Sequence, residues 1–168
     1  MRAYDLSALS ALIVEPDTLL RRVLTDMLFA FGLAKVDAAV DPASAWARLD
    51  ETSVYDLILT ELDFEGHDGA ELIRDIRQHP VPAVRMQPLI ALTLDARIDR
   101  VAMARDCGAT EFLAKPIFTT KLYDRIVMLI ERPRPFIHVP NRYFGPDRRR
   151  SFQDFLGEER RAPAAAHA

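Results

Sequence analysis

Two arginine clusters near the carboxyl terminus are the residues best suited to recognition chemistry. The sequences GPDRRR (residues 145–150) and GEERR (residues 157–161) share the pattern Gly-x-acid-Arg-Arg and lie 12 residues apart, with Tyr143 and Phe144 just before the first. A guanidinium can stack on a base and donate two hydrogen bonds to a guanine edge or a phosphate, which an ammonium cannot do. Glycine lets the backbone approach a ligand, and the acids can orient the guanidiniums or accept from guanine N–H groups. The pattern indicates a ligand with two guanines and two phosphates.

The segment that carries these clusters, residues 133–168, differs in composition from the rest of the chain. It holds seven arginines, four acids, no lysine and five of the 11 prolines, and its apolar residues show no periodicity. We therefore expect an extended segment that is disordered until a ligand binds. A solvated tail without a ligand is the alternative. The candidate ligand contacts are Tyr143, Phe144, Asp147, Arg148, Arg149, Arg150, Arg160 and Arg161.

The preceding residues, 1–132, have the composition of one acidic globular domain. They carry 15 Lys plus Arg against 21 Asp plus Glu, so a basic tail of +3 follows a body of −6. This charge distribution gives poor long-range attraction to nucleic acid. Cys107 is the only cysteine, which excludes a disulfide framework and favours a reducing cytosol. No apolar run approaches the ~20 residues that span a membrane, and we expect a cytoplasmic protein.

Short apolar runs alternate with amphipathic stretches in this domain and must position its functional residues. Wholly apolar strands interleaved with helices predict a doubly wound (βα)5 α/β fold, with a parallel sheet covered on both faces. Ligands of such sheets lie beyond the carboxyl ends of the strands. The predicted strands are residues 8–14, 35–39, 55–60, 89–93 and 111–114. The predicted helices are residues 17–31, 42–49, 70–78, 98–107 and 119–131.

Four segments in order resemble the receiver domain of two-component response regulators, which is CheY-like and flavodoxin-like in fold. They are LIVEPDTLLRRVL, YDLILTELDFEGHDGAELIRDIR, LIALT and GATEFLAKPI, and the resemblance covers residues 8–131. In that family an acidic pair and an acceptor aspartate bind Mg²⁺, while a hydroxyl and a lysine hold the phosphoryl oxygens. The resemblance places the pair on Glu15 and Pro16, the acceptor on Glu61, the hydroxyl on Thr93, and the lysine on Lys115 before a cis-type proline, Pro116.

This phosphorylation site is degenerate. Pro16 supplies no carboxylate, and Asp17 beside it has the position of a helix cap. Glu61 places its carboxylate about one C–C bond further from the strand than aspartate does, and phosphoryl transfer tolerates little misplacement. We expect neither Mg²⁺ nor phosphorylation, which makes this a pseudo-receiver. Either Glu61 bonds Lys115 and Thr93 and holds the domain near its activated arrangement, or a Glu61–Lys115 ion pair only supports the fold.

Two further residues have roles that the fold explains. Phe112 lies where the family has a rotating aromatic residue, although its apolar strand also suits the core, which we favour. Cys107 precedes Gly108 at a packed position and has no evident base or metal partner, so we expect an inert thiol.

The combination of a receiver with an arginine-rich tail resembles the Cle family of CheY-like proteins. That resemblance implies a non-enzymatic effector whose arginine-rich segment binds cyclic di-GMP and which acts on the flagellar motor, chemotaxis and surface attachment. It also implies recruitment to the flagellar pole and a protein partner, such as the motor switch, on the face formed by residues 98–107, 111–114 and 119–131. A phosphorylation-independent signalling adaptor with an idle tail is the first alternative. A nucleic-acid-binding regulator using the Arg tail is the second, and the absence of a helix-turn-helix after the receiver weakens it.

Overall fold

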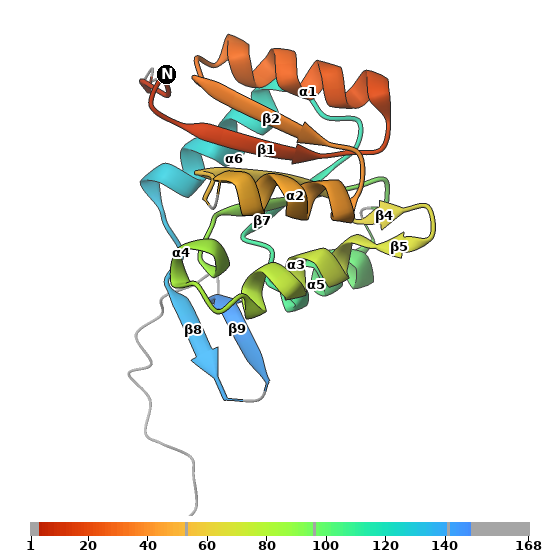
Figure 1. The fold of residues 1–168 in the computed structure, drawn as a ribbon, viewed down its shortest axis with the longest axis vertical. Coiled ribbons are helices and arrows are strands. Elements are labelled where there is room, and N and C mark those ends of the chain that lie inside the picture. The colour runs from red at the N-terminus through yellow and green to blue at the C-terminus, as the bar shows by residue number, and fades with distance from the viewer. Residues whose placement is uncertain (1–3, 53, 96, 141, 149–168) are drawn as a thin grey trace, which may run out of the picture.

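A five-stranded parallel sheet forms the centre of the protein. The structure, a computed structural model, describes residues 4–52, 54–95, 97–140 and 142–148. The strand order is β2-β1-β3-β6-β7, and every neighbouring pair is parallel (Figure 1). The central strands are almost wholly buried, as expected when helices cover both faces of a sheet. The strands are β1 (Ser10–Val14), β2 (Lys35–Ala39), β3 (Leu57–Glu61), β6 (Leu89–Thr93) and β7 (Glu111–Ala114).

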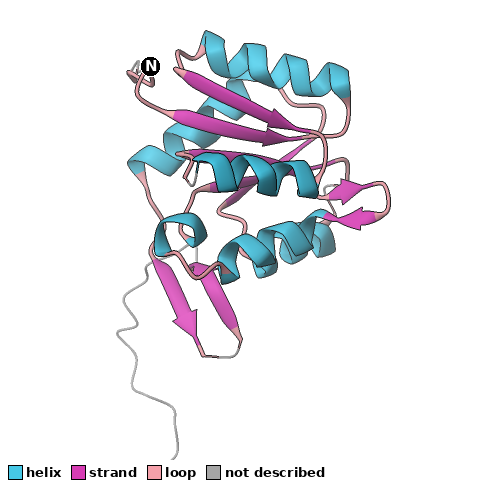
Figure 2. Cartoon of the chain, viewed as in Figure 1, coloured by secondary structure: helices cyan, strands magenta, loops and turns pink. Residues whose placement is uncertain are grey.

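Helices lie on both faces of this sheet (Figure 2). On one face, Leu24 of α1 and Leu122 of α6 belong to the same core. On the other face, α2, α3 and α5 contribute side chains such as Leu49, Leu72 and Ala104 to a second core. The doubly wound (βα)5 α/β fold is therefore as the sequence predicts. The helices are α1 (Thr18–Ala30), α2 (Pro42–Thr52), α3 (Gly69–Gln78), α5 (Ile98–Cys107) and α6 (Thr119–Glu131), with a single turn α4 (Pro82–Arg85).

Capping residues set the helix ends. The carboxylate of Asp17 accepts a hydrogen bond from the backbone N–H of Leu20 at 2.6 Å and begins α1, as expected. Asp41 accepts from the N–H of Ser44 at 2.7 Å and begins α2, which continues beyond the predicted end at residue 49. Gly108 ends α5 with φ +110°, a conformation that suits glycine.

Two local elements were not predicted. A short ribbon of β4 (Asp63–Phe64) and β5 (His67–Asp68) follows β3, and Gly66 turns between them with φ +76°. The turn α4 lies in the proline-rich connection, where Pro82 occupies the first helical position. Neither element has an amphipathic period long enough to read from sequence.

The chain continues after α6 into an antiparallel hairpin. Strands β8 (Phe136–Val139) and β9 (Tyr143–Pro146) pair with each other, and Figure 1 shows them beside α3 and α4. We expect no regular structure in residues 133–168 before a ligand binds, and the structure corrects this expectation for residues 136–139 and 143–146. Residues 149–168 lie outside the described residues.

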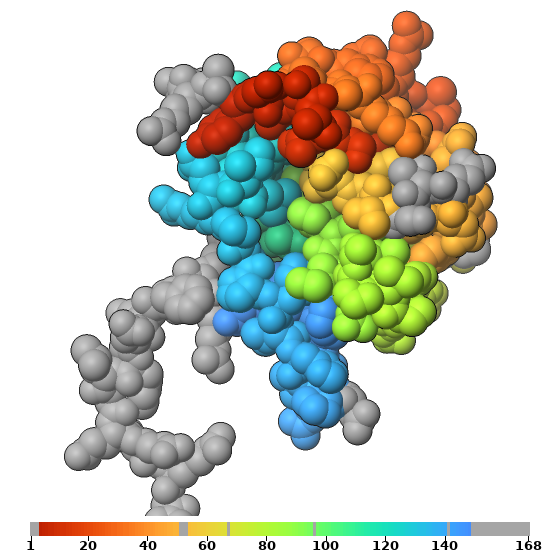
Figure 3. Space-filling view, turned by 60° about the vertical axis from the view of Figure 1, so that its left-hand side comes forward, coloured from red at the N-terminus to blue at the C-terminus, as the bar shows by residue number. Residues whose placement is uncertain are grey.

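Aromatic side chains dock the hairpin on the receiver. The Arg77 guanidinium of α3 lies 5.1 Å from the centre of the Phe136 ring, and that of Arg85 lies 4.8 Å from the Phe144 ring. A Cβ on Gly145 would come 2.8 Å from Cζ of Tyr143 and 3.3 Å from Cα of Gly108, so close packing requires glycine there. In the space-filling view the hairpin, in blue, lies against the green surface and extends beyond the body (Figure 3). Sequence reasoning missed this docking because cation–π partners leave no periodic pattern.

Within the part of the chain that the structure describes, no helix combines the length and apolar character that crossing a bilayer requires.

Candidate functional site

The ammonium of Lys115 lies between two buried carboxylates at the carboxyl end of the sheet. Glu15 follows β1, Glu61 ends β3 and Lys115 follows β7, so the parallel strands bring all three to one edge. Lys115 Nζ is 2.7 Å from Glu15 Oε2 and also contacts Glu61 Oε2. The side chains are 1%, 3% and 9% exposed for Glu15, Glu61 and Lys115 respectively. We call these three residues the Glu–Lys–Glu cluster.

Backbone N–H groups occupy the other carboxylate oxygens of this cluster. Glu61 Oε1 accepts from the N–H groups of Leu62 and Asp63 at 2.6 and 3.0 Å. Glu15 Oε1 accepts from the N–H of Asp17 at 3.1 Å. Every carboxylate oxygen of the cluster thus has a protein donor, which offsets the cost of burying the charges.

The pKa of Lys115 shows the balance of forces in the cluster. Burial by itself lowers this pKa, but the hydrogen bonds to Glu15 and Glu61, together with their negative charges, outweigh burial and raise it above the ordinary lysine value. Lys115 is therefore a cation at neutral pH.

The residues at this edge do not fit a Mg²⁺ site. Mg²⁺ requires an octahedron of oxygen ligands. Pro16 offers no side-chain oxygen, Asp17 is engaged in capping α1, and Lys115 places a positive charge between the two remaining carboxylates.

Thr93 bonds Asp95 and not Glu61, contrary to the hypothesis that Glu61 bonds both Lys115 and Thr93. Its hydroxyl donates to the carbonyl of Asp95 at 3.1 Å and accepts from the N–H of Asp95 at 3.0 Å. The Glu61–Lys115 contact of the activated-like hypothesis is present, whereas its Glu61–Thr93 bond is not among the hydrogen bonds of the described residues. Local turn geometry explains the difference, because a threonine hydroxyl readily bonds backbone groups two residues ahead. The Lys115–Pro116 bond is cis, as expected.

The face predicted to bind a partner contains a shallow groove of about 430 Å³ between α5 and β7. Phe112 is partly buried and packs on the core, in line with the interpretation that we favoured. Arg134 from the segment after α6 bonds Glu111 at 2.8 Å and also lines the groove. Arg100 of α5 is paired with Asp63.

Arg148 is the one arginine of the two clusters that the described residues include. Its guanidinium lies 3.9 Å from the centre of the Tyr143 ring, and its Nη1 is 3.2 Å from Oδ1 of Asp106 on α5. Tyr143 in turn donates from its hydroxyl to the carbonyl of Pro146 at 2.8 Å, which fixes the ring. Arg149, Arg150, Arg160 and Arg161 lie outside the described residues.

The other candidate contacts of this segment have structural partners. Phe144 packs 5.6 Å from Phe136 and beneath Arg85, so its ring is engaged in holding the hairpin. The N–H of Asp147 donates to the carbonyl of Pro135 at 2.8 Å and closes the base of the hairpin. Tyr143 is thus the stacking candidate that the structure brings to Arg148.

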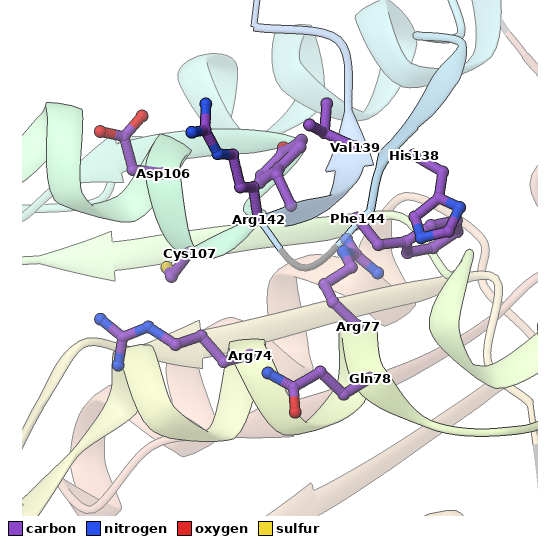
Figure 4. A pocket seen from close by; sticks show the side chains of 10 residues that line it. Arg74, Arg77, Gln78, Asp106, Cys107, His138, Val139, Arg142 and Phe144 are labelled. Carbon is purple, nitrogen blue, oxygen red and sulfur yellow. The ribbon is translucent and has the colours of Figure 1, made fainter.

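A cavity of about 420 Å³ lies between the hairpin and helices α3 and α5 (Figure 4). We call it the α3–hairpin cavity. Sequence reasoning did not identify it, because its walls come from three elements far apart in the chain. It is lined by Arg74, Arg77, Gln78, Asp106, Cys107, His138, Val139, Arg142, Tyr143 and Phe144.

Arg77 is a buried cation beside this cavity. It is only 2% exposed, and it donates to the carbonyls of Gly108, Arg85 and Gln87 at 2.8 to 2.9 Å. Burial lowers its pKa to about 10. A sequence signal does exist, since Arg77 follows Ile73 by four residues and therefore continues the apolar stripe of α3.

Comparisons with known proteins agree with this geometry. Residues 11–127 match the family model described as "Response regulator receiver domain". The chain is 33% identical over 122 residues to "Two-component response regulator-like APRR3" of Arabidopsis thaliana, covering 72% of this chain and 24% of that protein. It is 31% identical over 123 residues to "Transcriptional regulatory protein PdtaR" of Mycobacterium tuberculosis, covering 73% of this chain and 57% of that protein. The chain therefore spans only part of both relatives.

Solved structures share the fold. A putative response regulator from Chloroflexus aurantiacus aligns with a TM-score of 0.67 and 26% identity, covering 74% of this chain and 98% of that one. Chemotaxis protein CheY4 of Vibrio cholerae aligns with a TM-score of 0.65 and 21% identity, covering 71% of this chain and 96% of that one. With a five-stranded receiver sheet, a lysine before a cis proline and a family match over most of its length, the chain belongs to the response regulator receiver domain family.

Proposed function

We propose that this protein is a cyclic di-GMP-binding effector built on a receiver that is not phosphorylated. The observation that carries the proposal is the stacking of Arg148 on Tyr143 at 3.9 Å, at the start of the first arginine cluster. One face of the guanidinium lies on the tyrosine ring, and a guanine base can stack on the other face. The docked hairpin fixes this platform in advance, which lowers the ordering entropy that binding costs.

The absence of phosphorylation is part of the same proposal. A phosphoryl group on Glu61 would have to displace the Lys115 contact and the two backbone N–H bonds that hold the carboxylate. Without a Mg²⁺ ligand from Pro16, little is present to neutralise the charge of the transferred group. In this proposal the nucleotide takes over the role of the input signal.

The output in this proposal is a protein contact and not a reaction. Receiver domains are generally non-enzymatic signalling domains. The resemblance to Cle proteins suggests the flagellar motor switch or a surface-attachment component as the partner, bound on the face of α5, β7 and α6. Arg134 and Arg148 both line the groove on this face, so the segment that would hold the nucleotide borders the partner surface.

Isothermal titration calorimetry of the full chain with cyclic di-GMP tests the proposal. We expect saturable binding, and no comparable heat with cyclic di-AMP, whose adenine edge lacks the O6 acceptor for an arginine fork. No binding of either nucleotide would overturn the proposal. Equal binding of both would replace it with a general anion site.

A second candidate is a phosphorylation-independent adaptor in which the nucleotide plays no part. The completeness of the Glu–Lys–Glu cluster favours it, because a cluster whose three charges are satisfied by one another and by backbone N–H groups needs no ligand at that edge of the sheet. Partner binding that is identical with and without cyclic di-GMP would support this candidate.

A further inference from the structure

The α3–hairpin cavity has a strongly cationic lining. Arg74 on α3, Arg77 on α3 and Arg142 at the hairpin turn border it together with His138, against the single carboxylate of Asp106. In Figure 4, Arg74 and Arg142 lie on opposite sides of the cavity, one on the helix and one above it. Among the described residues neither of these two forms an ion pair, and Asp106 is already held by Arg105 and Arg148.

The buried charge of Arg77 is a second reason to expect an anion in this cavity. Arg77 is almost fully buried, and its hydrogen-bond acceptors within the described residues are three backbone carbonyls and the hydroxyl of Thr110. No carboxylate of the described residues neutralises this charge by direct contact. A bound anion would compensate it, because Coulomb attraction is strong where water is excluded. Burial also lowers the pKa of Arg77, because removal from water disfavours the charged guanidinium.

The cavity also adjoins the stacking platform of the proposed nucleotide site. Tyr143 lines the cavity and carries Arg148 on its ring, and Asp106 lines the cavity and pairs with Arg148. The two partners of Arg148 therefore border the α3–hairpin cavity, while Arg148 itself lines the groove between α5 and β7. In a guanine dinucleotide, a phosphate directly follows the sugar of each base.

We propose that the α3–hairpin cavity is an anion subsite that binds a phosphate group of the nucleotide between Arg74 and Arg142. The inference rests on the proposed function and extends it, because Arg74 belongs to the receiver body. The receiver then contributes directly to the nucleotide site, and the arginine-rich segment supplies only part of it. A control variant that removes one arginine far from the cavity distinguishes direct binding by Arg74 from a purely long-range electrostatic effect.

Calorimetric titration of full-length variants with cyclic di-GMP tests the subsite. Arg74 is exposed, so Arg74→Ala is expected to fold and to weaken binding about tenfold through loss of a charge-assisted hydrogen bond. Arg74→Lys should lose less affinity than Arg74→Ala, since a lysine ammonium can still pair with a phosphate. Arg22→Ala removes another exposed arginine, from α1 on the opposite face of the sheet, and should leave the affinity unchanged.

Alkylation of Cys107 by iodoacetamide locates the ligand independently. Cys107 is the only cysteine, it lines the cavity, and burial raises its pKa to about 11, so its reaction at pH 8 is slow and requires local opening. A phosphate in the cavity should slow the reaction further at saturating nucleotide.

The outcomes separate the two proposals. If the wild type binds but Arg74→Ala binds equally well, or nucleotide leaves Cys107 alkylation unchanged or faster, the subsite is wrong while the proposed function stands. If the wild type does not bind cyclic di-GMP, both are wrong. A loss with Arg22→Ala equal to that with Arg74→Ala would reduce the effect to net charge and also overturn the subsite.

Discussion

The Lys115 ammonium contacts the Glu61 carboxylate at the carboxyl end of the sheet, and both side chains are almost fully buried. In a receiver with an intact site, a lysine at this position holds oxygens of the phosphoryl group. Here the longer glutamate side chain already supplies an oxygen to Lys115, and Glu15 supplies a second. Lys115 therefore contacts two carboxylates of the chain itself.

Acetyl phosphate with Mg²⁺ should not label the wild-type protein. Pro16 provides no metal ligand, and Lys115 and two N–H groups occupy the carboxylate of Glu61. Intact-mass spectrometry checks this result. The double variant Pro16→Asp with Glu61→Asp restores both a metal ligand and the shorter acceptor, and should gain Mg²⁺-dependent labelling.

A stable phospho-adduct on Glu61 of the wild type would contradict this view of the site. Labelling of Asp63 would contradict it as well. Asp63 is half-exposed and paired with Arg100. Failure of the double variant to gain labelling would show that more than these two positions prevents transfer.

Lys115→Met should destabilise the domain by roughly 3–5 kcal/mol, since it leaves two buried carboxylates without their cation. Glu61→Gln should cost less, because the amide oxygen still accepts from Leu62 and Asp63 and Lys115 keeps Glu15. Urea unfolding followed by circular dichroism measures both. Equal stability of Lys115→Met and wild type would show that the cluster does not stabilise the fold.

The stabilisation by Lys115 should depend on pH in the alkaline range. Burial lowers the pKa of Lys115, but its bonds to Glu15 and Glu61 raise it overall above its ordinary value of 10.5. The folded state therefore binds this proton more tightly than the unfolded state, so the contribution is complete below pH 10.5 and is lost as pH rises through the folded pKa. The difference in unfolding free energy between wild type and Lys115→Met should shrink there, and a difference that grows with pH would reverse the assigned sign.

The sheet and the Glu61–Lys115 pair could be predicted from sequence. Apolar runs such as residues 55–60 identify strands, and the resemblance to receivers places Glu61 and Lys115 at the carboxyl edge of the sheet, where they are in contact. The contact of Glu15 with Lys115 was not predicted. The bond of Thr93 to Asp95 could not be predicted, because the choice between a neighbouring backbone group and Glu61 depends on loop geometry.

The hairpin and its cavity escaped prediction for a different reason. The sequence identifies Tyr143, Phe144 and the following arginines as candidate ligand contacts, but a proline-rich segment without periodicity gives no sign of docking. The partners of the hairpin, Arg77 and Arg85, lie more than 50 residues earlier in the chain. Only the tertiary structure brings these residues together. Phe144 and Asp147, which the sequence assigns to the ligand, instead hold the hairpin in place.

Removing the aromatic anchor of the hairpin should expose Cys107. Phe144 packs against Phe136 and Arg85, so Phe144→Ala should loosen the hairpin and accelerate alkylation of Cys107 by about tenfold or more, because burial keeps the thiol unreactive. Phe29→Ala, an exposed phenylalanine on α1, is the matched control and should leave the rate unchanged. An unchanged rate in Phe144→Ala would show that the hairpin does not cover the cysteine.

Replacing both Arg148 and Arg149 should abolish binding of cyclic di-GMP. A forked contact to guanine contributes about 1–3 kcal/mol, so loss of two removes most of the affinity. Changing the pair to Lys should weaken binding nearly as much as changing it to Ala, since the stacking plane on Tyr143 is lost. Calorimetry measures both, with Arg22→Ala as the control for loss of a remote positive charge. Retention of full affinity by the Lys pair would show that charge alone recognises the ligand.

Charge reversal on the face of α5, β7 and α6 should weaken partner binding without unfolding the domain. Arg105 and Lys121 are exposed on α5 and α6, and among the described residues Arg105 pairs only with its exposed neighbour Asp106. Arg100 instead joins α5 to Asp63, so reversing Arg100 would break an ion pair between two elements. We therefore expect Arg105→Glu with Lys121→Glu to lower capture of a flagellar switch component about tenfold or more, with an unchanged circular dichroism spectrum. Arg22→Glu on α1 is the control. Undiminished capture by the double variant, or an equal loss with Arg22→Glu, would move the partner surface away from this face.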